Sequence, residues 1–312
     1  MRPCHIIVAF LMIVSACGTT DDVSKNGPPA NNDGYSRCSH DAHVGGFTVH
    51  LAELYTSVQG SVADGVAPYQ VPETTKSEGS CELLVPPNLV CVPSCESGQT
   101  CNRAGSCVLH PENRDVGTIT IDGLKAHVSM DPIPSINFYN FTGDLPHPGY
   151  EPSAELTLHA TGGEIEPFSI LAFGVDPLSV IDEEMFLEHN APATLSWLPS
   201  GEVPNSRIRI LLSIANHGGI PARVECTTDD TGSFEIPANL VNTLLDVGYS
   251  GFPTVTVTRE SAGSVSVDYG CVEFVVWSKV VLPVEIPGLT SCSFADDCLE
   301  GQICRADLTC GT

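Results

Sequence analysis

Histidine and carboxylate side chains are densest in one short segment near the N terminus. Residues 39–43 read Ser-His-Asp-Ala-His, and His50 follows seven residues later. Imidazole and carboxylate groups at this spacing can share a metal ion when the loop that carries them is extended. His40, Asp41 and His43 are therefore the candidate metal ligands of the sequence. An ordinary polar loop explains the same residues and is the interpretation we favour, so no metal or other cofactor is expected.

A hydrolytic site would require a nucleophile, a base and a group that orients the base. The sequence contains no H-E-x-x-H, G-x-S-x-G, Walker or dinucleotide-binding glycine motif. His217 follows an expected strand, and Asp230 and Ser233 would have to join it to form a triad. Their spacing gives no reason to expect this, so the protein is predicted not to be an enzyme. A hydrolase with a site near His217 and Asp230 is the alternative.

The chain is strongly acidic. It has 13 Lys and Arg against 38 Asp and Glu, a formal net charge of −25, which disfavours nucleic acid and anionic lipid as electrostatic partners. Residues 126–206 contain twelve Asp or Glu and no Lys or Arg, with the greatest density at residues 182–184 and at Glu188. Such oxygen-rich loops can bind Ca²⁺. We favour a solvated acidic surface, because no EF-hand pattern is present.

Aromatic side chains could contact a ligand. Trp197 is one of two tryptophans, and Phe138, Tyr139 and Phe141 form a short cluster. Exposed aromatic rings can stack on sugars. Because β-sandwich strands bury aromatic residues routinely, core packing is the expected role here.

Cysteine gives the strongest signal. Two of the fourteen cysteines belong to the leader and its cleavage site, which leaves an even number in the body. In an exported chain this favours disulfides over free thiols or zinc. Cys226 and Cys271 both fall in expected strands, so a bridge between them is predicted, which leaves Cys38 to pair with Cys81. The disulfide candidates are Cys38, Cys81, Cys91, Cys95, Cys101, Cys107, Cys226, Cys271, Cys292, Cys298, Cys304 and Cys310.

Eight of these cysteines lie in two short clusters that repeat one another. Both contain C-x₂-G-Q-x-C-x₅-C, and residues 95–107 map onto residues 298–310 at an offset of 203. Segments this short cannot fold on apolar contacts alone, so disulfides must hold them, and the pairing within each cluster stays open. A four-cysteine zinc site is disfavoured, because zinc knuckles use C-x₂-C pairs.

The elements that carry these residues are predicted to be strands. Apolar and polar residues alternate over 154–160 and 207–214, which is typical of strands with one buried face. Pro237, followed by apolar residues at helical spacing up to Gly248, predicts one short helix. The fold class is therefore all-β: an antiparallel β-sandwich with one short helix and two small disulfide-rich modules. The expected strands cover residues 47–51, 59–64, 118–121, 124–130, 154–160, 168–175, 207–214, 222–227, 254–259, 263–268 and 271–282.

The N terminus has the pattern of a lipoprotein signal peptide. Arg2 precedes an apolar run at residues 6–14 that is too short to span a bilayer, and Val14-Ser15-Ala16-Cys17 resembles a bacterial lipobox. Cys17 is predicted to carry the lipid, with palmitate among its acyl chains. An ordinary cleaved signal with a chance cysteine is the alternative. The protein is expected to be exported and lipid-anchored in the outer membrane, and the face on which it lies stays open.

Most of the mature chain resembles a group of predicted lipoproteins of myxobacteria and related deltaproteobacteria. The resemblance lies in the lipobox, G-S-V-A-D-G at 60–65, the cysteine modules and the motifs at 117–123, 196–197, 216–218, 225–226, 230–234 and 236–237. The modules are similar in cysteine spacing to EGF-like or Dickkopf-N-terminal-like repeats. The resemblance implies a lipid-anchored β-sandwich and no particular activity.

These observations together predict a lipid-anchored cell-envelope protein that acts as a non-catalytic binding or adhesion module for a glycan or an envelope protein. A structural envelope protein with no specific ligand is a further alternative. The expected parts are a signal peptide (1–16), a flexible tether (17–36), N-terminal strands that join the sandwich (37–80), a first cysteine-rich module (81–111), the sandwich (112–287) and a second cysteine-rich module (288–312).

Overall fold

The computed structural model describes residues 34–201, 203, 205–215 and 221–312. The signal peptide, Cys17, most of the tether and His217 lie outside the described residues. Within the described part of the chain, no helix is long and apolar enough to cross a membrane.

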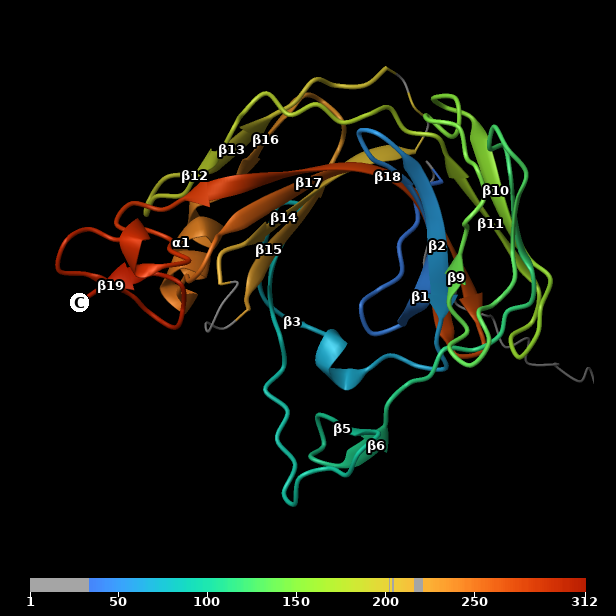
Figure 1. Cartoon of the computed structure of the whole chain (residues 1–312), viewed down its shortest axis with the longest axis horizontal. Helices are drawn as coiled ribbons and strands as arrows, with labels where there is room; N and C mark the ends of the chain where they lie inside the picture. The colour runs from blue at the N-terminus through green and yellow to red at the C-terminus, as the bar shows by residue number, and fades with distance from the viewer. Residues whose placement is uncertain (1–33, 202, 204, 216–220) are drawn as a thin grey trace, which may run out of the picture.

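One large sheet curves through the whole molecule (Figure 1). Its main path runs β3-β4-β15-β14-β17-β18-β1-β2-β9, and β12 pairs with β18 as the tenth strand. Neighbouring strands are antiparallel except that β1 and β12 each pair with β18 in parallel. The strands are β1 (His43–Leu51), β2 (Thr56–Val62), β3 (Glu73–Glu78), β4 (Cys81–Val85), β9 (Tyr139–Asn140), β12 (Met185–Phe186), β14 (Ser206–Ser213), β15 (Arg223–Thr228), β17 (Thr254–Val267) and β18 (Gly270–Glu285).

The second layer consists of separate smaller units that cover one face of this sheet. A four-stranded sheet, β11-β10-β7-β8, lies at one end of the arch, and the β13–β16 hairpin with helix α1 lies toward the other (Figure 1). These elements are β7 (Ile119–Asp122), β8 (Val128–Met130), β10 (Glu155–Ala160), β11 (Phe168–Phe173), β13 (Ala193–Ser196), β16 (Ser233–Ile236) and α1 (Ala238–Val247).

Two hydrophobic cores lie side by side between the layers, and β18 contributes to both. Its even-numbered residues share one face, since side chains alternate along a strand. Phe274 and Val276 pack in the core with the four-stranded sheet, whereas Leu282 and Val284 pack in the core with α1 and the β13–β16 hairpin. The long strands therefore join two packed units into one body.

Helix α1 forms where the sequence predicts it. Pro237 is its N-cap and Gly248, at φ 115°, its C-cap. Glycine suits that position because other residues rarely adopt positive φ. Leu240 and Leu244, one helical turn apart, are fully buried against the large sheet.

The all-β fold class with one helix is confirmed, and the large sheet is mixed rather than wholly antiparallel. The parallel pair arises because β1 enters beside β18, which lies at the other end of the sequence. β1 and β2 both belong to the large sheet, with the first cysteine-rich module following them in the chain. Cys81 lies in β4 of the same sheet, so the range 81–111 expected for that module includes a strand of the sandwich.

The predicted Cys226–Cys271 and Cys38–Cys81 bridges are wrong. The structure joins Cys38 to Cys271 and Cys81 to Cys226. β15 lies antiparallel to β4 with Cys226 directly opposite Cys81, which brings their Cα atoms to 4.0 Å. Cys271 stands at the start of β18, where the segment before β1 passes it. The first bridge thus ties the segment before β1 to the large sheet, and the second joins two neighbouring strands within it.

The two cysteine-rich modules share one connectivity, first to third and second to fourth cysteine. The pairs are Cys91–Cys101, Cys95–Cys107, Cys292–Cys304 and Cys298–Cys310. The first module contains the hairpin β5 (Gln99–Cys101) and β6 (Cys107–Leu109), after the short helix η1 (Pro68–Gln70). The second contains η2 (Ala295–Asp297), β19 (Ile303–Cys304) and β20 (Cys310–Gly311).

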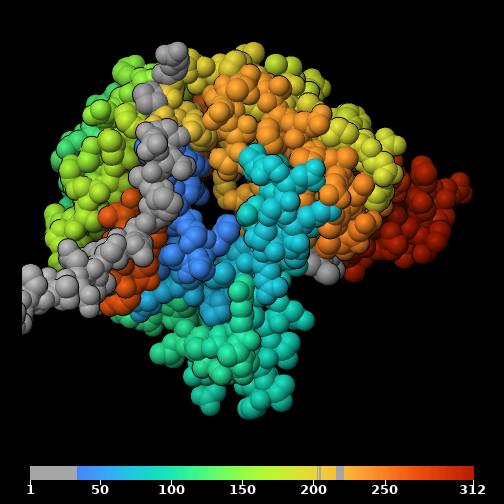
Figure 2. All heavy atoms as spheres, turned by 180° about the vertical axis from the view of Figure 1, so that it is seen from behind, coloured from blue at the N-terminus to red at the C-terminus, as the bar shows by residue number. Residues whose placement is uncertain are grey.

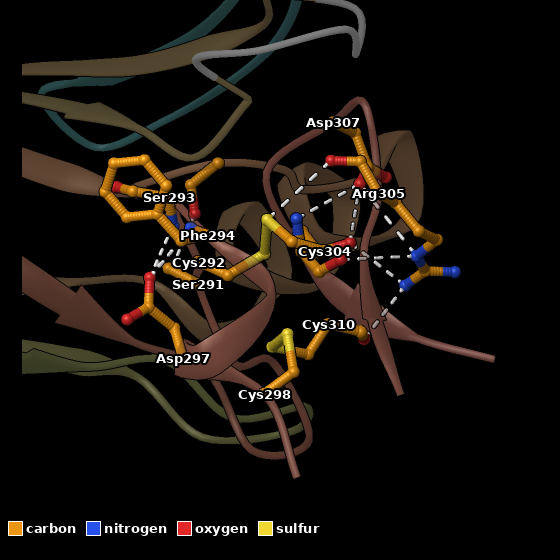
Figure 3. The surroundings of a disulfide bond; sticks show 12 residues. Ser291, Cys292, Ser293, Phe294, Asp297, Cys298, Cys304, Arg305, Asp307 and Cys310 are labelled. Carbon is orange, nitrogen blue, oxygen red and sulfur yellow. Dashed lines mark hydrogen bonds and ion pairs between the residues drawn. A yellow bond between two sulfur atoms is a disulfide. The ribbon is translucent and has the colours of Figure 1, made fainter. Parts of the chain in front are cut away.

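Polar contacts order the second module beside its disulfides (Figure 3). The Asp297 carboxylate accepts backbone hydrogen bonds from Ser293 at 2.7 Å and Phe294 at 3.0 Å. The Arg305 guanidinium donates to the Thr309 hydroxyl at 2.9 Å. Phe294 is itself 74% exposed, so apolar burial contributes little to this module.

Removing both bridges of the first module should unfold that module alone. In a variant with Cys91, Cys95, Cys101 and Cys107 changed to serine, the hairpin loses the cross-links that replace a core. The free energy of unfolding of the sandwich, measured in urea, should change by no more than about 1 kcal/mol, because both hydrophobic cores lie elsewhere. Limited proteolysis should cut at residues 91–107. A large fall in this free energy would show that the module supports the sandwich.

Candidate functional site

The face of the large sheet that points away from both cores is concave and partly open. In β18 the odd-numbered residues Glu273, Val275, Trp277 and Lys279 lie on this face. Trp277 is half-buried and Lys279 is exposed. In the space-filling view an opening lies between the N-terminal segment (blue), the β3–β4 segment (cyan) and the orange strands (Figure 2). We take this concave face as the candidate functional site.

A segment that we call the N-terminal strap, residues 35–42, crosses part of this face. The Tyr35 hydroxyl donates to Glu260 at 2.6 Å, and the Cys38 backbone N–H donates to Glu273 at 2.6 Å. The Arg37 guanidinium lies between both carboxylates, 3.6 Å from Glu260 and 3.3 Å from Glu273. Glu260 and Glu273 are 2% and 4% exposed, so the strap supplies the cation and the donors that such buried charges require.

The electrostatics of the strap agree with this geometry. Burial disfavours the charged form of Arg37, but Glu260 and Glu273 outweigh it and raise the pKa of the guanidinium. Burial and then the charge of Glu260 raise the pKa of the Tyr35 phenol well above its ordinary value. Tyr35 therefore remains a neutral donor and Arg37 a cation, which keeps the strap attached at neutral pH.

A second charge cluster surrounds Glu225 of β15 on the same face. Arg209 of β14 donates twice to Glu225, once from Nε at 2.9 Å, and Arg223 Nε lies 3.6 Å away. Burial would raise the pKa of Glu225, but the charge and hydrogen bonds of Arg209 lower it. Both arginines are thus paired with the Glu225 carboxylate of the protein itself.

Between these clusters lies a hollow of about 380 Å³, whose walls differ in character. Trp277 forms an aromatic wall, with His50 of β1 stacked on it at 3.8 Å between ring centroids and 11° between planes. The Lys279 Nζ lies over the same indole, 4.8 Å from its centroid. Thr256 and Thr258 of β17 line the floor. Within the described residues, neither threonine hydroxyl has a hydrogen-bond partner, so both are available to form hydrogen bonds with the hydroxyls of a ligand.

The candidate metal ligands do not converge. His40 Nε2 lies 4.0 Å from Glu225, His43 Nε2 lies 3.6 Å from Glu273, and Asp41 accepts from the Ser39 hydroxyl at 2.6 Å. Among the residues that the structure describes, ligand-type atoms gather within 4.8 Å in threes only in the two cysteine modules. Those sulfurs are in disulfides and offer no thiolate.

Asp230 lies in a buried ion pair. Its Oδ1 accepts from Trp197 Nε1 at 2.7 Å, and its Oδ2 accepts from Arg259 Nε at 2.7 Å. Burial would raise the pKa of Asp230, but the hydrogen bonds from Arg259 and Trp197 lower it. A carboxylate held in this way is poorly placed to orient a histidine. Ser233 is the exposed first residue of β16, and His217 falls outside the described residues.

The other sequence candidates have structural roles. Trp197 and Tyr139 are buried, as core packing predicted, and Tyr139 contacts Phe47 edge-on at 5.4 Å. In the acidic segment, the Asp182 carboxylate accepts from the Ser196 backbone N–H at 2.6 Å. These residues do not form part of the concave face.

The residue that the sequence analysis missed is Trp277, the second tryptophan. It lies in the apolar run 274–277, which reads as a wholly buried strand. The available signal was that Glu273 lies two strand periods before Trp277 and Lys279 one period after it, on the same face. Polar residues at a period of two beside a tryptophan indicate a face that is not wholly buried.

Comparisons with known proteins add little. No family model and no curated protein matches the chain. Among solved structures it is similar to the FN1–FN3 domains of chicken CNTN1, at 10% identity and a TM-score of 0.20, over 74% of this chain and 70% of that chain. A likeness at that level carries no argument, so the β-sandwich rests on the strands of this chain.

Proposed function

We propose that this protein is a non-catalytic binding module of the cell envelope that holds its ligand in the hollow around Trp277. The ligand classes are a glycan or an envelope protein. The observation that carries the proposal is an aromatic wall beside unpartnered hydroxyls on an open concave face. Binding sites combine apolar walls with a few convergent polar groups in this way.

The charged groups of the concave face support binding rather than acid–base chemistry. Glu260 and Glu273 are the two carboxylates nearest the hollow, and Arg37 lies between them. A general acid or base must exchange its proton with a substrate, whereas these groups hold the strap. In the proposed site, Glu260, Glu273 and Arg37 hold the strap in place and so fix one wall of the hollow.

The envelope location is part of the same proposal. Six disulfides suit an oxidising compartment outside the cytoplasm. The lipobox at residues 14–17 would supply a lipid anchor at Cys17, as in the myxobacterial lipoprotein group that the sequence resembles. Binding at an anchored surface would then hold the ligand close to the membrane.

Changing Trp277 to alanine should abolish most ligand binding without unfolding the protein. The side chain is half-buried on the concave face, and an aromatic anchor at the centre of a site commonly supplies 2 kcal/mol or more, about thirtyfold in affinity. The full chain in detergent micelles would be measured against a glycan array and against solubilised envelope proteins. Phe294→Ala, which removes an exposed ring from the second module, is the matched control.

Three results would count against this proposal. Equal binding by the wild type and the Trp277 variant would move the site away from the hollow. Saturable binding to neither class would favour the structural envelope protein without a specific ligand. Turnover of any polysaccharide, peptide or ester would contradict the non-catalytic assignment.

A further inference from the structure

We propose that the ligand is a carbohydrate bearing an isolated carboxylate, and that Lys279 binds that carboxylate. The inference rests on the proposed function, since it names the ligand of the same hollow.

Lys279 is the unpaired cation of a protein rich in anions. The chain has 13 Lys and Arg, of which all but Arg2 and Lys25 lie in the described residues. Each of the other described lysines and arginines has an ion pair or a hydrogen bond to the protein. Among these residues Lys279 alone has neither, and its contact is with the indole of Trp277. With 38 acidic residues available, leaving this cation unpaired keeps it accessible to an external anion.

The surroundings of Lys279 match a sugar. Lys279 lies directly opposite Thr258 in the β17–β18 register, and Thr256 is the next residue of β17 on that face. A pyranose ring in the hollow, beside the Trp277 indole and next to the Lys279 that lies over it, would direct hydroxyls to these threonines and a carboxylate to the ammonium group. Burial and the charge of Lys279 lower the pKa of His50, and Arg37 and Arg209 are held by carboxylates of the protein, so Lys279 is the unpaired cation of the hollow at neutral pH.

The volume of the hollow and the net charge of the chain restrict the class of ligand further. A hollow of about 380 Å³ is in the range of small-molecule sites, whereas a protein partner covers about 800 Å² of surface on each side. A net charge of −25 repels a polyanion at long range, so a ligand with one carboxylate among neutral sugars fits better than a uniformly charged polymer.

The test compares oligosaccharides that differ only in the acid group. The array would carry oligosaccharides with a single glucuronic, galacturonic or mannuronic acid, each beside its carboxyl-reduced form. The wild type should bind at least one acidic member about tenfold or more tightly than its reduced partner, as expected for one charge-assisted hydrogen bond. Lys279→Met should lose that preference and bind both forms equally. Lys125→Met, which removes the same charge at an exposed pair with Glu151, should keep it.

Each outcome separates this inference from the proposed function. Trp277-dependent binding of sugars without a preference for the acid would overturn the inference and leave the binding module standing. Trp277-dependent binding of an envelope protein, with no sugar bound, would do the same. A preference for the acid that survives in Lys279→Met would also overturn the assignment. If the wild type bound no member of either ligand class, both the inference and the proposed function would be overturned.

Discussion

Replacing Arg259 with methionine is expected to lower the free energy of unfolding by about 3–5 kcal/mol. The arginine side chain is 1% exposed, and its Nε donates to Asp230 at 2.7 Å. Its other nitrogens donate to the carbonyls of Pro177 at 2.8 Å and Leu198 at 2.6 Å. Removing the cation leaves the Asp230 carboxylate without its counter-ion, with Trp197 Nε1 still donating to it, and leaves two carbonyls without their donor in a largely buried place. This loss comprises an unpaired charge as well as broken hydrogen bonds.

The pH dependence of stability should change with it. In the wild type the pKa of Asp230 is lower in the folded than in the unfolded state, because Arg259 and Trp197 outweigh burial. That contribution is complete above the unfolded pKa, near 4 for aspartate, and is lost as the pH falls through the folded value. Without Arg259, the pKa of Asp230 in the folded state rises toward or above its unfolded value, so this acid-dependent loss of stability shrinks. The difference in stability between the wild type and the variant should therefore narrow as the pH falls from 7 to 3.

Urea unfolding from pH 3 to pH 8 measures both effects. Arg103→Met is the matched control, because Arg103 and Glu73 form an exposed pair at 3.8 Å that should contribute less than about 1 kcal/mol. If the two variants lost equal stability, the buried pair of Arg259 and Asp230 would contribute no more than an exposed pair.

The second large effect is expected from the bridges that close long loops. Cys38–Cys271 and Cys81–Cys226 span 233 and 145 residues, and a cross-link of that length restricts the unfolded chain strongly. Changing either pair to serine should cost about 3–5 kcal/mol under non-reducing conditions. The same measurement on the first module's cysteines, which span 10 and 12 residues, provides the comparison.

The two long-range variants should differ in one further respect. Loss of Cys38–Cys271 should release the strap, so hydrogen exchange should increase at Arg37 and the residues around it, whereas loss of Cys81–Cys226 should affect β4 and β15. Equal stability of either variant and the wild type would mean that strand pairing alone holds these segments, contrary to the expectation.

Much of the fold could be predicted because local patterns determine it. Alternation in Arg207–Ile214 placed Ile208, Ile210 and Leu212 in a core, and all are fully buried. The expected break between residues 259 and 263 was wrong, since β17 continues through it. Gly263 there does not make a turn. A Cβ at Gly263 would lie 2.1 Å from the Leu171 carbonyl oxygen, so glycine permits the close approach of β11.

The candidate site could not be predicted in the same way, because it depends on contacts distant in sequence. The strap reaches Glu260 and Glu273 across more than two hundred residues. An even number of cysteines gave the presence of disulfides, but partner choice followed from the register of β4 against β15. Trp277 joins His50 only because β1 lies parallel to β18, a pairing that no local pattern indicates.

The Cys38–Cys271 bridge also has a mechanical consequence. A pull applied along the chain from the N terminus reaches Cys38 first and passes through the disulfide into β18. β18 is bonded on both sides, to β17 and to β1, so the tension is shared across the middle of the sheet. Extension would therefore stop at Cys38: it would detach Tyr35 and Arg37 from Glu260 and Glu273, while β18 with Trp277 stays in place under load.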